Sequence, residues 1–192
     1  LVRFDGVRFF PWTAPDGKPL FSTSIYSLLG ARDGSLWIGA GISLARCRNG
    51  EVFNYAEPLG RINSIIEDSV GAVWMSRSVR VIDTKGPLCR AVGTAIRCYG
   101  PADGIPFLTG GPLLSDTLGN LWIGSARGSC RWRPGSSCTY LPGPLSQAGG
   151  AVVRAIASGG DGSLWAGMEQ SGAGLGLQQL SQGVWKPYVL PE

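Results

Sequence analysis

Carboxylates, arginines and cysteines are the chemically active side chains of this chain, because its 192 residues include no histidine. The chain itself therefore holds no Ser-His-Asp triad, no Cys-His pair and no histidine ligand for zinc. It also lacks the histidine that receives phosphate in a sensor kinase. The five cysteines show no Cys-x-x-Cys spacing, so zinc binding is not expected. From these residues we predict no catalytic site, no metal and no cofactor.

Acidic residues recur in short turns, each a few residues before a tryptophan. In one interpretation they form a ring on one face that binds a cation or sugar hydroxyls. In the other, each Asp side chain accepts hydrogen bonds from the backbone of its own turn. We favour the second interpretation, because the carboxylates recur together with the turn. The residues are Asp33, Glu67, Asp68, Asp116 and Asp161.

Three residues are candidates for ligand contact, namely Arg77, Arg127 and Trp132. Arg77 and Arg127 follow tryptophan segments, where we expect loops between strands, and such loops gather on one face of a repeated β fold. Their guanidinium groups could there meet an anionic ligand. Trp132, like Trp12 and Trp185, lies outside the tryptophan repeat described below. That position is compatible with ligand contact or with an edge strand.

Two pairs of cysteines bracket short hairpins. Cys89 and Cys98 flank one hairpin, and Cys130 and Cys138 flank the next. Two pairs in successive hairpins favour disulfides over buried thiols, with Cys47 left single. Each bridge would stabilise the fold by about 2–3 kcal/mol by restricting the unfolded chain. Disulfides would also agree with a periplasmic location.

A repeat supplies the elements that must position these residues. An octapeptide occurs four times, with Gly three residues before a tryptophan and an aliphatic residue directly before it. Three copies end on Gly, and Ser76 is the exception. The spacing corresponds to units of about 40 residues. The repeated structural positions are Gly34, Trp37, Gly71, Trp74, Gly119, Trp122, Gly162 and Trp165.

One unit is expected to form four antiparallel strands. An alternating apolar run precedes a polar turn in which Gly adopts a positive φ. The tryptophan of the next strand is large enough to fill the space between neighbouring sheets, and the trailing Gly permits close approach of another backbone. Asn49 and Gly50 mark the turn between the third and fourth strands. Such units in series predict an all-β propeller, with a β-sandwich or a solenoid of β-arches as alternatives.

The segment Asp-Gly-Ser-Leu-Trp-Ile-Gly at residues 33–39 and its relatives resemble the two-component regulator propeller repeat. The resemblance covers residues 25–189 and is weakest where Met75 and Ser76 replace Ile-Gly. It implies a non-catalytic sensor region of a bacterial hybrid histidine kinase or related signalling protein, on the periplasmic or extracellular face of the inner membrane. Sensors of this family bind an external small-molecule or glycan-derived ligand and pass the state through the membrane.

Two other functions remain open at this stage. A scaffold would use the edges of its sheets to join other proteins. A propeller lyase acting on cyclic peptide antibiotics resembles the chain in repeat style, but such lyases depend on a catalytic histidine. The absence of histidine therefore argues against the lyase.

The repeat also predicts the domain organisation. We expect one propeller region over residues 1–192, with half a blade at residues 1–10 and full blades at about 25–56, 62–100, 109–142 and 152–190. This arrangement predicts a fragment of a larger propeller, or a chain that pairs with a second copy. Apolar faces on the terminal blades predict self-association or contact with neighbouring blades.

Composition excludes further classes. The 30 Gly and 13 Pro residues indicate many turns, in agreement with an all-β fold. The net charge of +4 is spread along the chain without a concentrated basic face, so nucleic-acid binding is not expected. Because no uninterrupted apolar stretch approaches the length of a membrane span, direct membrane insertion is not expected either.

Overall fold

The computed structural model describes residues 1–14, 16–55, 60–78, 85–126, 128–142, 152–169 and 176–189. These residues form antiparallel sheets, namely one two-stranded hairpin and four sheets of four strands each. A short 3-10 helix, Pro101–Asp103, is the helical element among them. The all-β architecture of four-stranded units in series is confirmed.

Each four-stranded sheet is built from strands in chain order. The hairpin comprises β1 (Val2–Phe4) and β2 (Phe9–Pro11). The first sheet comprises β3 (Ile25–Gly30), β4 (Leu36–Ala40), β5 (Ser43–Arg48) and β6 (Glu51–Asn54). The second comprises β7 (Arg61–Glu67), β8 (Val73–Ser78), β9 (Leu88–Val92) and β10 (Ala95–Tyr99). The third comprises β11 (Leu113–Ser115), β12 (Leu121–Ser125), β13 (Gly128–Trp132) and β14 (Thr139–Pro142). The fourth comprises β15 (Val153–Ser158), β16 (Leu164–Met168), β17 (Leu177–Ser181) and β18 (Val184–Pro187).

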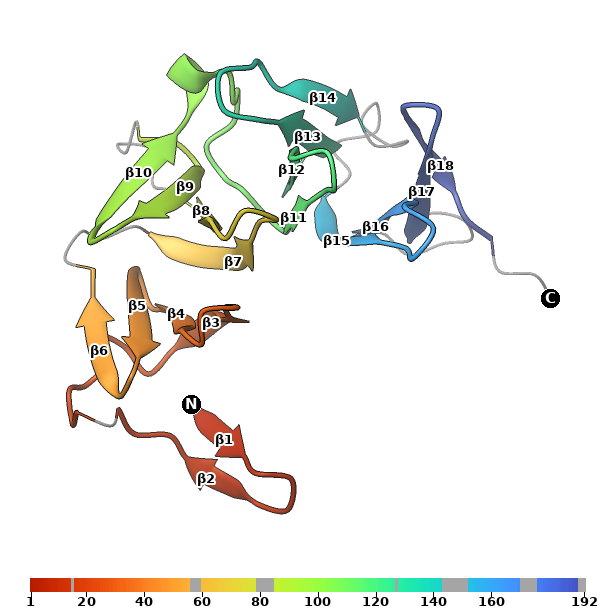
Figure 1. Cartoon of the computed structure of the whole chain (residues 1–192). Helices are drawn as coiled ribbons and strands as arrows, with labels where there is room; N and C mark the ends of the chain where they lie inside the picture. Colours follow the sequence, from red (N-terminus) through yellow and green to blue (C-terminus); the bar gives the residue numbers. More distant parts are fainter. Residues whose placement is uncertain are drawn as a thin grey trace.

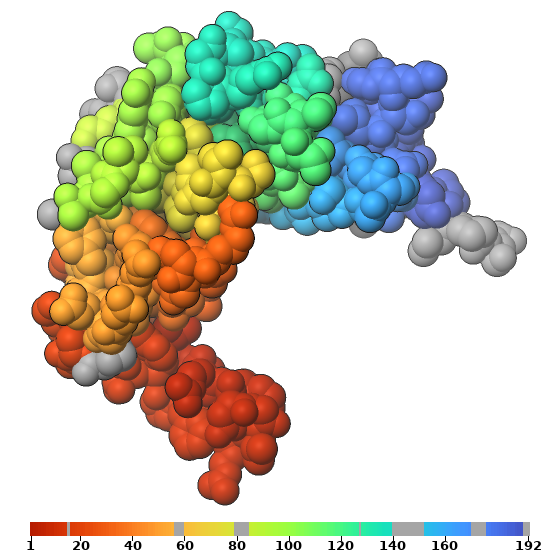
Figure 2. Space-filling view, in the orientation of Figure 1, coloured from red at the N-terminus to blue at the C-terminus, as the bar shows by residue number. Residues whose placement is uncertain are grey.

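The four sheets follow one another around an open arc, as Figures 1 and 2 show. The first strand of each sheet lies on the inner side of the arc and the fourth on the outer side (Figure 1). Neighbouring inner strands contact one another, β3 with β7, β7 with β11, and β11 with β15. The arc is therefore a segment of a β-propeller in which each sheet is a blade.

The turn before each repeated tryptophan has the same backbone in all four sheets. The N–H of the residue six positions before Trp donates to the carbonyl two positions before it, as from Asp116 to Asn120 at 3.0 Å. Gly three positions before Trp then takes a left-handed conformation, which costs a residue with a side chain more than it costs Gly. The φ values are 80° at Gly34, 85° at Gly71, 78° at Gly119 and 80° at Gly162.

The repeated tryptophans of the first three sheets fill the spaces between adjacent sheets. Trp37 packs with Ile62 and Val73 of the second sheet, and Trp74 packs with Leu121 of the third. Trp122 packs with Val153 of the fourth sheet. The predicted role of these rings in packing is confirmed.

A small residue two positions after Trp allows the next inner strand to approach. A Cβ added at Gly39 would lie 3.0 Å from Cβ of Ile62, and one at Gly124 would lie 3.0 Å from Cγ1 of Val153. In the second sheet this position is Ser76, and the residue facing it is Gly110. In this contact the glycine therefore lies on the facing segment, instead of two positions after Trp. The Ser76 hydroxyl donates to the Gly111 carbonyl.

Candidate functional site

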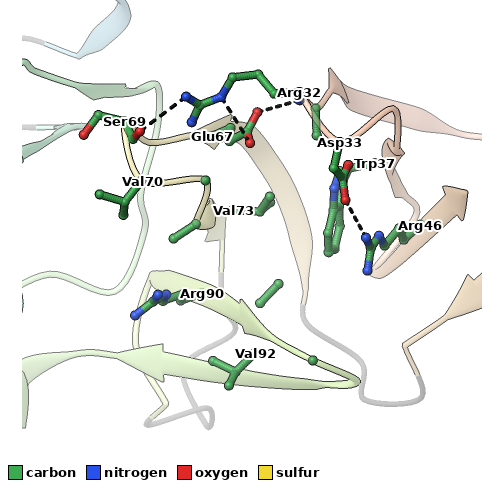
Figure 3. Close-up of a pocket in the computed structure, with 15 residues that line it drawn as sticks. Arg32, Asp33, Trp37, Arg46, Glu67, Ser69, Val70, Val73, Arg90 and Val92 are labelled. Carbon is green, nitrogen blue, oxygen red and sulfur yellow. Dashed lines mark hydrogen bonds and ion pairs between the residues drawn. The ribbon is translucent and has the colours of Figure 1, made fainter.

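An open groove of about 860 Å³ lies between the first and second sheets, beside the turns that precede Trp37 and Trp74. Figure 3 shows Trp37, Asp33 and Arg46 on the side of the first sheet and Val70, Val73 and Val92 on the side of the second. Arg32 reaches across between the two sheets. Charged and apolar side chains therefore face one cavity from opposite walls.

Arg32 joins the two sheets at this groove. Its backbone N–H donates to Glu67 at 2.8 Å, and its Nε lies 3.3 Å from the same carboxylate. Its guanidinium also donates to the Ser69 and Asp68 carbonyls. Glu67 is therefore an ion-pair partner of Arg32 rather than a cap of its own turn. The pair fixes one turn against the next.

The wall formed by the first sheet carries a cluster around Asp33. Arg46 donates from Nη2 to Asp33 at 2.7 Å and from Nε to the Ser35 hydroxyl at 2.9 Å. Arg48 lies 3.4 Å from the same carboxylate. Hydrogen bonds from Ser35, helped by the positive charges of Arg46 and Arg48, lower the pKa of Asp33 to about 2. Asp33 is therefore ionised at neutral pH and shared by two cations.

Trp37 differs from the other repeated tryptophans in its hydrogen bonding. The Nε1 donors of Trp74 and Trp122 reach Asp68 at 2.8 Å and Asp116 at 2.9 Å. Trp165 donates to the Ser163 hydroxyl at 2.7 Å. Within the described residues, the Nε1 of Trp37 is buried without a hydrogen-bond partner. The buried N–H of a residue that lines the groove is thus left without an acceptor.

The local cause is visible in the turn sequence. The position occupied by Asp68 and Asp116 in the second and third turns holds Ala31 in the first, which has no acceptor on its side chain. Ser35 corresponds to Ser163, but its hydroxyl accepts from Arg46 instead of from the indole. Neither position therefore supplies an acceptor for Trp37 Nε1 in the structure.

The recurring aspartates cap their own turns, as predicted. Asp33 and Asp161 each accept from the backbone N–H two residues later, both at 2.9 Å. Asp68 accepts from Val70 and Ala72, and Asp116 accepts from two backbone N–H groups and the Asn120 side chain. No group of three or more potential metal ligands occurs within the part of the chain that the structure describes.

Asp116 shows how these bonds act on ionisation. Its burial by itself would raise the pKa of the carboxyl. Hydrogen bonds from Asn120, Trp122 and Leu118 outweigh that effect, so the pKa lies below its usual value. The charged form of Asp116 is the one that the turn holds.

The structure places neither Arg77 nor Trp132 in the groove between the first and second sheets. Arg77 was expected in a loop, and that placement was wrong, because β8 extends through Ser78 and the Arg77 side chain is fully buried. Its Nε donates to the Gly86 carbonyl at 2.8 Å, so the strand is covered by the segment before β9. Arg127 lies outside the described residues.

Trp132 is a core residue in the structure. Its ring packs against Trp74 and Tyr99, and its Nε1 donates to the Asp103 carbonyl at 2.9 Å. Trp185 is also buried, with its Nε1 2.8 Å from the Ser129 hydroxyl. Both rings are therefore part of the packed core. A ligand-contact role for Trp132 stays a prediction, and the burial of its ring does not support that role.

The cysteines lie as the hairpin spacing predicts. The structure joins Cys89 to Cys98 in the second sheet and Cys130 to Cys138 in the third. Cys47 is half-buried, and this burial raises the pKa of its thiol. Oxidation of the two pairs in the isolated protein stays a prediction.

Sequence reasoning missed a row of arginines. On the third strand, Arg46, Arg90 and Arg131 lie directly opposite Trp37, Trp74 and Trp122. Each guanidinium carbon lies 5.2–5.8 Å from the facing ring centroid, a cation–π distance. A signal was present, because each of these arginines adjoins a cysteine in sequence.

A second groove of about 540 Å³ lies where the inner strands β7 and β15 begin. Its cations already have partners. Arg61 stacks over Tyr26 with its guanidinium carbon 4.5 Å from the ring centroid, and Arg154 is paired with Glu169. This groove is therefore the weaker candidate for a charged ligand.

Comparison with known proteins agrees with the repeat. The model of the family described as two component regulator propeller matches residues 19–41, which contain the first tryptophan turn. This match agrees with the resemblance to the two-component regulator propeller repeat that the sequence shows at residues 33–39. Comparison with curated protein sequences finds no match.

Solved structures resemble the fold. Virginiamycin B lyase from Staphylococcus aureus aligns with a TM-score of 0.69 and 16% identity, over 88% of this chain and 56% of the lyase. The extracellular domains of two hybrid two-component systems from B. thetaiotaomicron align with TM-scores of 0.67 and 0.66 and identities of 18% and 14%. These alignments cover 89% and 92% of this chain, and 23% and 24% of those domains. At these identities the likeness shows the propeller fold alone. The chain spans about half the length of the lyase and about a quarter of these extracellular domains.

Proposed function

We propose that this chain is a non-catalytic, ligand-binding segment of the sensory propeller of a two-component signalling protein, on the periplasmic or extracellular side of the membrane. The observation that carries the proposal is the two-component regulator propeller repeat at residues 19–41, built into serial four-stranded blades. The likeness to extracellular domains of hybrid two-component systems supports it. Among the described residues, no helix is long and apolar enough to cross a membrane.

Ligand binding at the contacts between adjacent blades would act on how those blades are placed relative to each other. Adjacent blades meet through polar bridges as well as through apolar packing, with Arg32 on Glu67 and Asn63 on the Gly110 carbonyl at 2.6 Å. A ligand held between the first and second sheets would contact both walls of the groove. Its binding would therefore stabilise one relative placement of the two blades.

A thermal-shift screen of the purified chain against glycan fragments and other small solutes tests the proposal. Binding to the folded chain raises the melting temperature by an amount that grows with the logarithm of the ligand concentration above the dissociation constant. We expect at least one solute that stabilises the chain in this way. A screen in which nothing stabilises the chain would favour the scaffold.

A scaffold is the second candidate, and one observation favours it. The hairpin of β1 and β2 exposes Val2, Phe4, Val7 and Phe9, an apolar surface of the kind that protein contacts cover. We expect self-association that strengthens with concentration in sedimentation velocity. A monomer at high concentration would remove this support.

A lyase activity is the least favoured function. A variant of virginiamycin B lyase in which a histidine is replaced by alanine is catalytically inactive and was solved with quinupristin, and the present chain has no histidine. We expect no turnover of quinupristin by the purified chain. Measurable turnover would contradict the non-catalytic assignment.

A further inference from the structure

The buried indole N–H of Trp37 has no acceptor in the part of the chain that the structure describes. The side chain is 4% exposed, lines the groove, and has no partner for Nε1 among the described residues. Buried donors in native proteins almost always have an acceptor. The equivalent donors of the other three repeats do find one, so this gap belongs to the first repeat and to its groove.

Arg46 places a second incompletely used donor group beside the indole. Its guanidinium carbon lies 5.2 Å from the centroid of the Trp37 ring. Nε and Nη2 are engaged by Ser35 and Asp33, whereas Nη1 makes no hydrogen bond within the described chain. A planar group with two oxygens matches a pair of neighbouring donors of this kind.

The local charge favours an anionic ligand. Asp33 is shared by Arg46 and Arg48, and Arg32 is balanced by Glu67. Arg90 also lines the groove, and its Nε has no hydrogen-bond partner among the described residues. These side chains together leave two positive charges unbalanced, so an anion with a planar pair of oxygens, such as a carboxylate, fits the site.

The opposite wall defines the rest of the ligand. Val70 and Val92 are 83% and 53% exposed, and both line the groove across from Trp37 (Figure 3). Exposed valines on one wall favour a ligand that carries an apolar face beside its acidic group.

We infer that the groove between the first and second sheets binds a small carboxylate-bearing ligand. The carboxylate accepts from Trp37 Nε1 and Arg46 Nη1, and the body of the ligand lies against Val70 and Val92. This inference names the ligand class for the proposed sensory function and rests on it. Sugar acids and simple organic acids share the required chemistry.

Isothermal titration of the purified chain with three probes tests the inference. Galacturonate and galactose have the same ring and differ in the carboxylate, and glutarate supplies a carboxylate without a sugar. We expect galacturonate or glutarate to bind at least about tenfold more tightly than galactose. Binding by galacturonate alone would identify a sugar acid, and binding by glutarate a simple organic acid. If neither carboxylate binds, or if galactose binds equally well, the inference is wrong.

Two variants locate the site. Trp37→Phe removes the donor and keeps an aromatic ring, and Arg46→Gln removes the cation, so each should weaken carboxylate binding by about tenfold or more. Trp165→Phe is the matched control in the fourth sheet, and it should leave binding unchanged. Circular dichroism would establish that each variant is folded. Unchanged affinity in folded Trp37→Phe would overturn the assignment of the donor.

Nuclear magnetic resonance of the ¹⁵N-labelled wild-type chain gives a readout that does not depend on a variant's stability. The indole N–H signal assigned to Trp37 should shift on addition of the carboxylate probe, while the signal of Trp165 stays in place. Equal shifts, or none at Trp37, would place the ligand elsewhere. If the solute screen yields a stabiliser whose binding ignores Trp37→Phe, the ligand site is wrong and the sensory function stands. If no solute binds at all, both fail.

Discussion

The two central sheets and the two outer sheets form the same turn with different side chains. In the second and third sheets, an aspartate six residues before Trp caps the turn and also accepts from the indole. In the first and fourth, the aspartate lies four residues before Trp and caps the turn without accepting from the indole. A serine two residues before Trp accepts from the indole in the fourth sheet, but not in the first.

The comparison shows that the backbone conformation of the turn does not depend on which side chain accepts from the tryptophan. The left-handed glycine and the backbone bonds of the turn recur in all four sheets. The acceptor for the tryptophan does not recur, because Asp at one position and Ser at another both serve. When Ser35 accepts from Arg46, the first repeat keeps its turn and the Trp37 N–H has no acceptor among the described residues. This is the donor to which we assign the proposed ligand.

The largest contrast is expected between aspartates of central and outer turns. Asp116→Ala removes four hydrogen bonds and should destabilise the chain by about 2–4 kcal/mol, because the buried Trp122 N–H loses its acceptor. Asp161→Ala removes one bond at an exposed turn and should cost clearly less. Urea unfolding of both variants measures the difference. Equal costs would break the distinction between the two kinds of turn.

The central sheets should also differ in their cysteines. Without reductant, alkylation of the unfolded chain should label Cys47 alone, and reduction should expose all five thiols. Reduction should lower the free energy of unfolding by about 2–3 kcal/mol for each bridge lost. Mass spectrometry counts the labels, and five labels before reduction would show that both pairs are thiols.

Packing between blades predicts an intermediate effect. A Cβ at Gly124 would lie 2.7 Å from Pro112 and 3.0 Å from Val153, so Gly124→Ala should destabilise by about 1–3 kcal/mol through overpacking. Gly30→Ala is the control, because nothing lies within 4 Å of a Cβ there. Differential scanning calorimetry should show a loss of melting temperature for Gly124→Ala alone.

A smaller difference is expected between equivalent indoles. Trp122→Phe and Trp37→Phe remove the same atoms from equally buried rings. Only Trp122 has a protein acceptor, so its replacement should cost about 1 kcal/mol more. Chemical denaturation without ligand measures this. A larger cost at Trp37 would mean that its donor is satisfied in solution.

The pH dependence at Asp33 should be the most modest effect. The pKa of Asp33 is lowered to about 2 in the folded chain, below its value of about 3.9 in unfolded chains. The stabilisation of the folded chain by ionised Asp33 is therefore fully present above the pKa that Asp33 has in the unfolded chain. This stabilisation is lost as the pH falls toward about 2. The stability gap between wild type and Asp33→Asn should narrow from pH 5 to pH 2 in urea titrations. A constant gap would show that the charge of Asp33 contributes nothing.

Local chemistry explains what could be predicted. Glycine three residues before each tryptophan, with a polar residue nearby, defines the turn through contacts among neighbours in sequence. The same local character allowed the turn-capping role of Asp116 to be predicted. The loop placement of Arg77 failed because the repeat ends at Ser76, whereas β8 continues through Ser78. There the Arg77 side chain donates to the Gly86 carbonyl, and the Arg77 carbonyl accepts from the distant Gly110 N–H.

The order and spacing of residues alone determined the serial blades, the turns and the packing role of the tryptophans, because these follow from periodicity and from bonds between near neighbours. Tertiary structure decided which tryptophan lacks an acceptor. That outcome depends on strand register, which sets Arg46 opposite Trp37 and within hydrogen-bond distance of the Ser35 hydroxyl. It also depends on the facing blade, whose Val70 and Val92 form the other wall of the groove. Neither contact follows from residues adjacent in sequence.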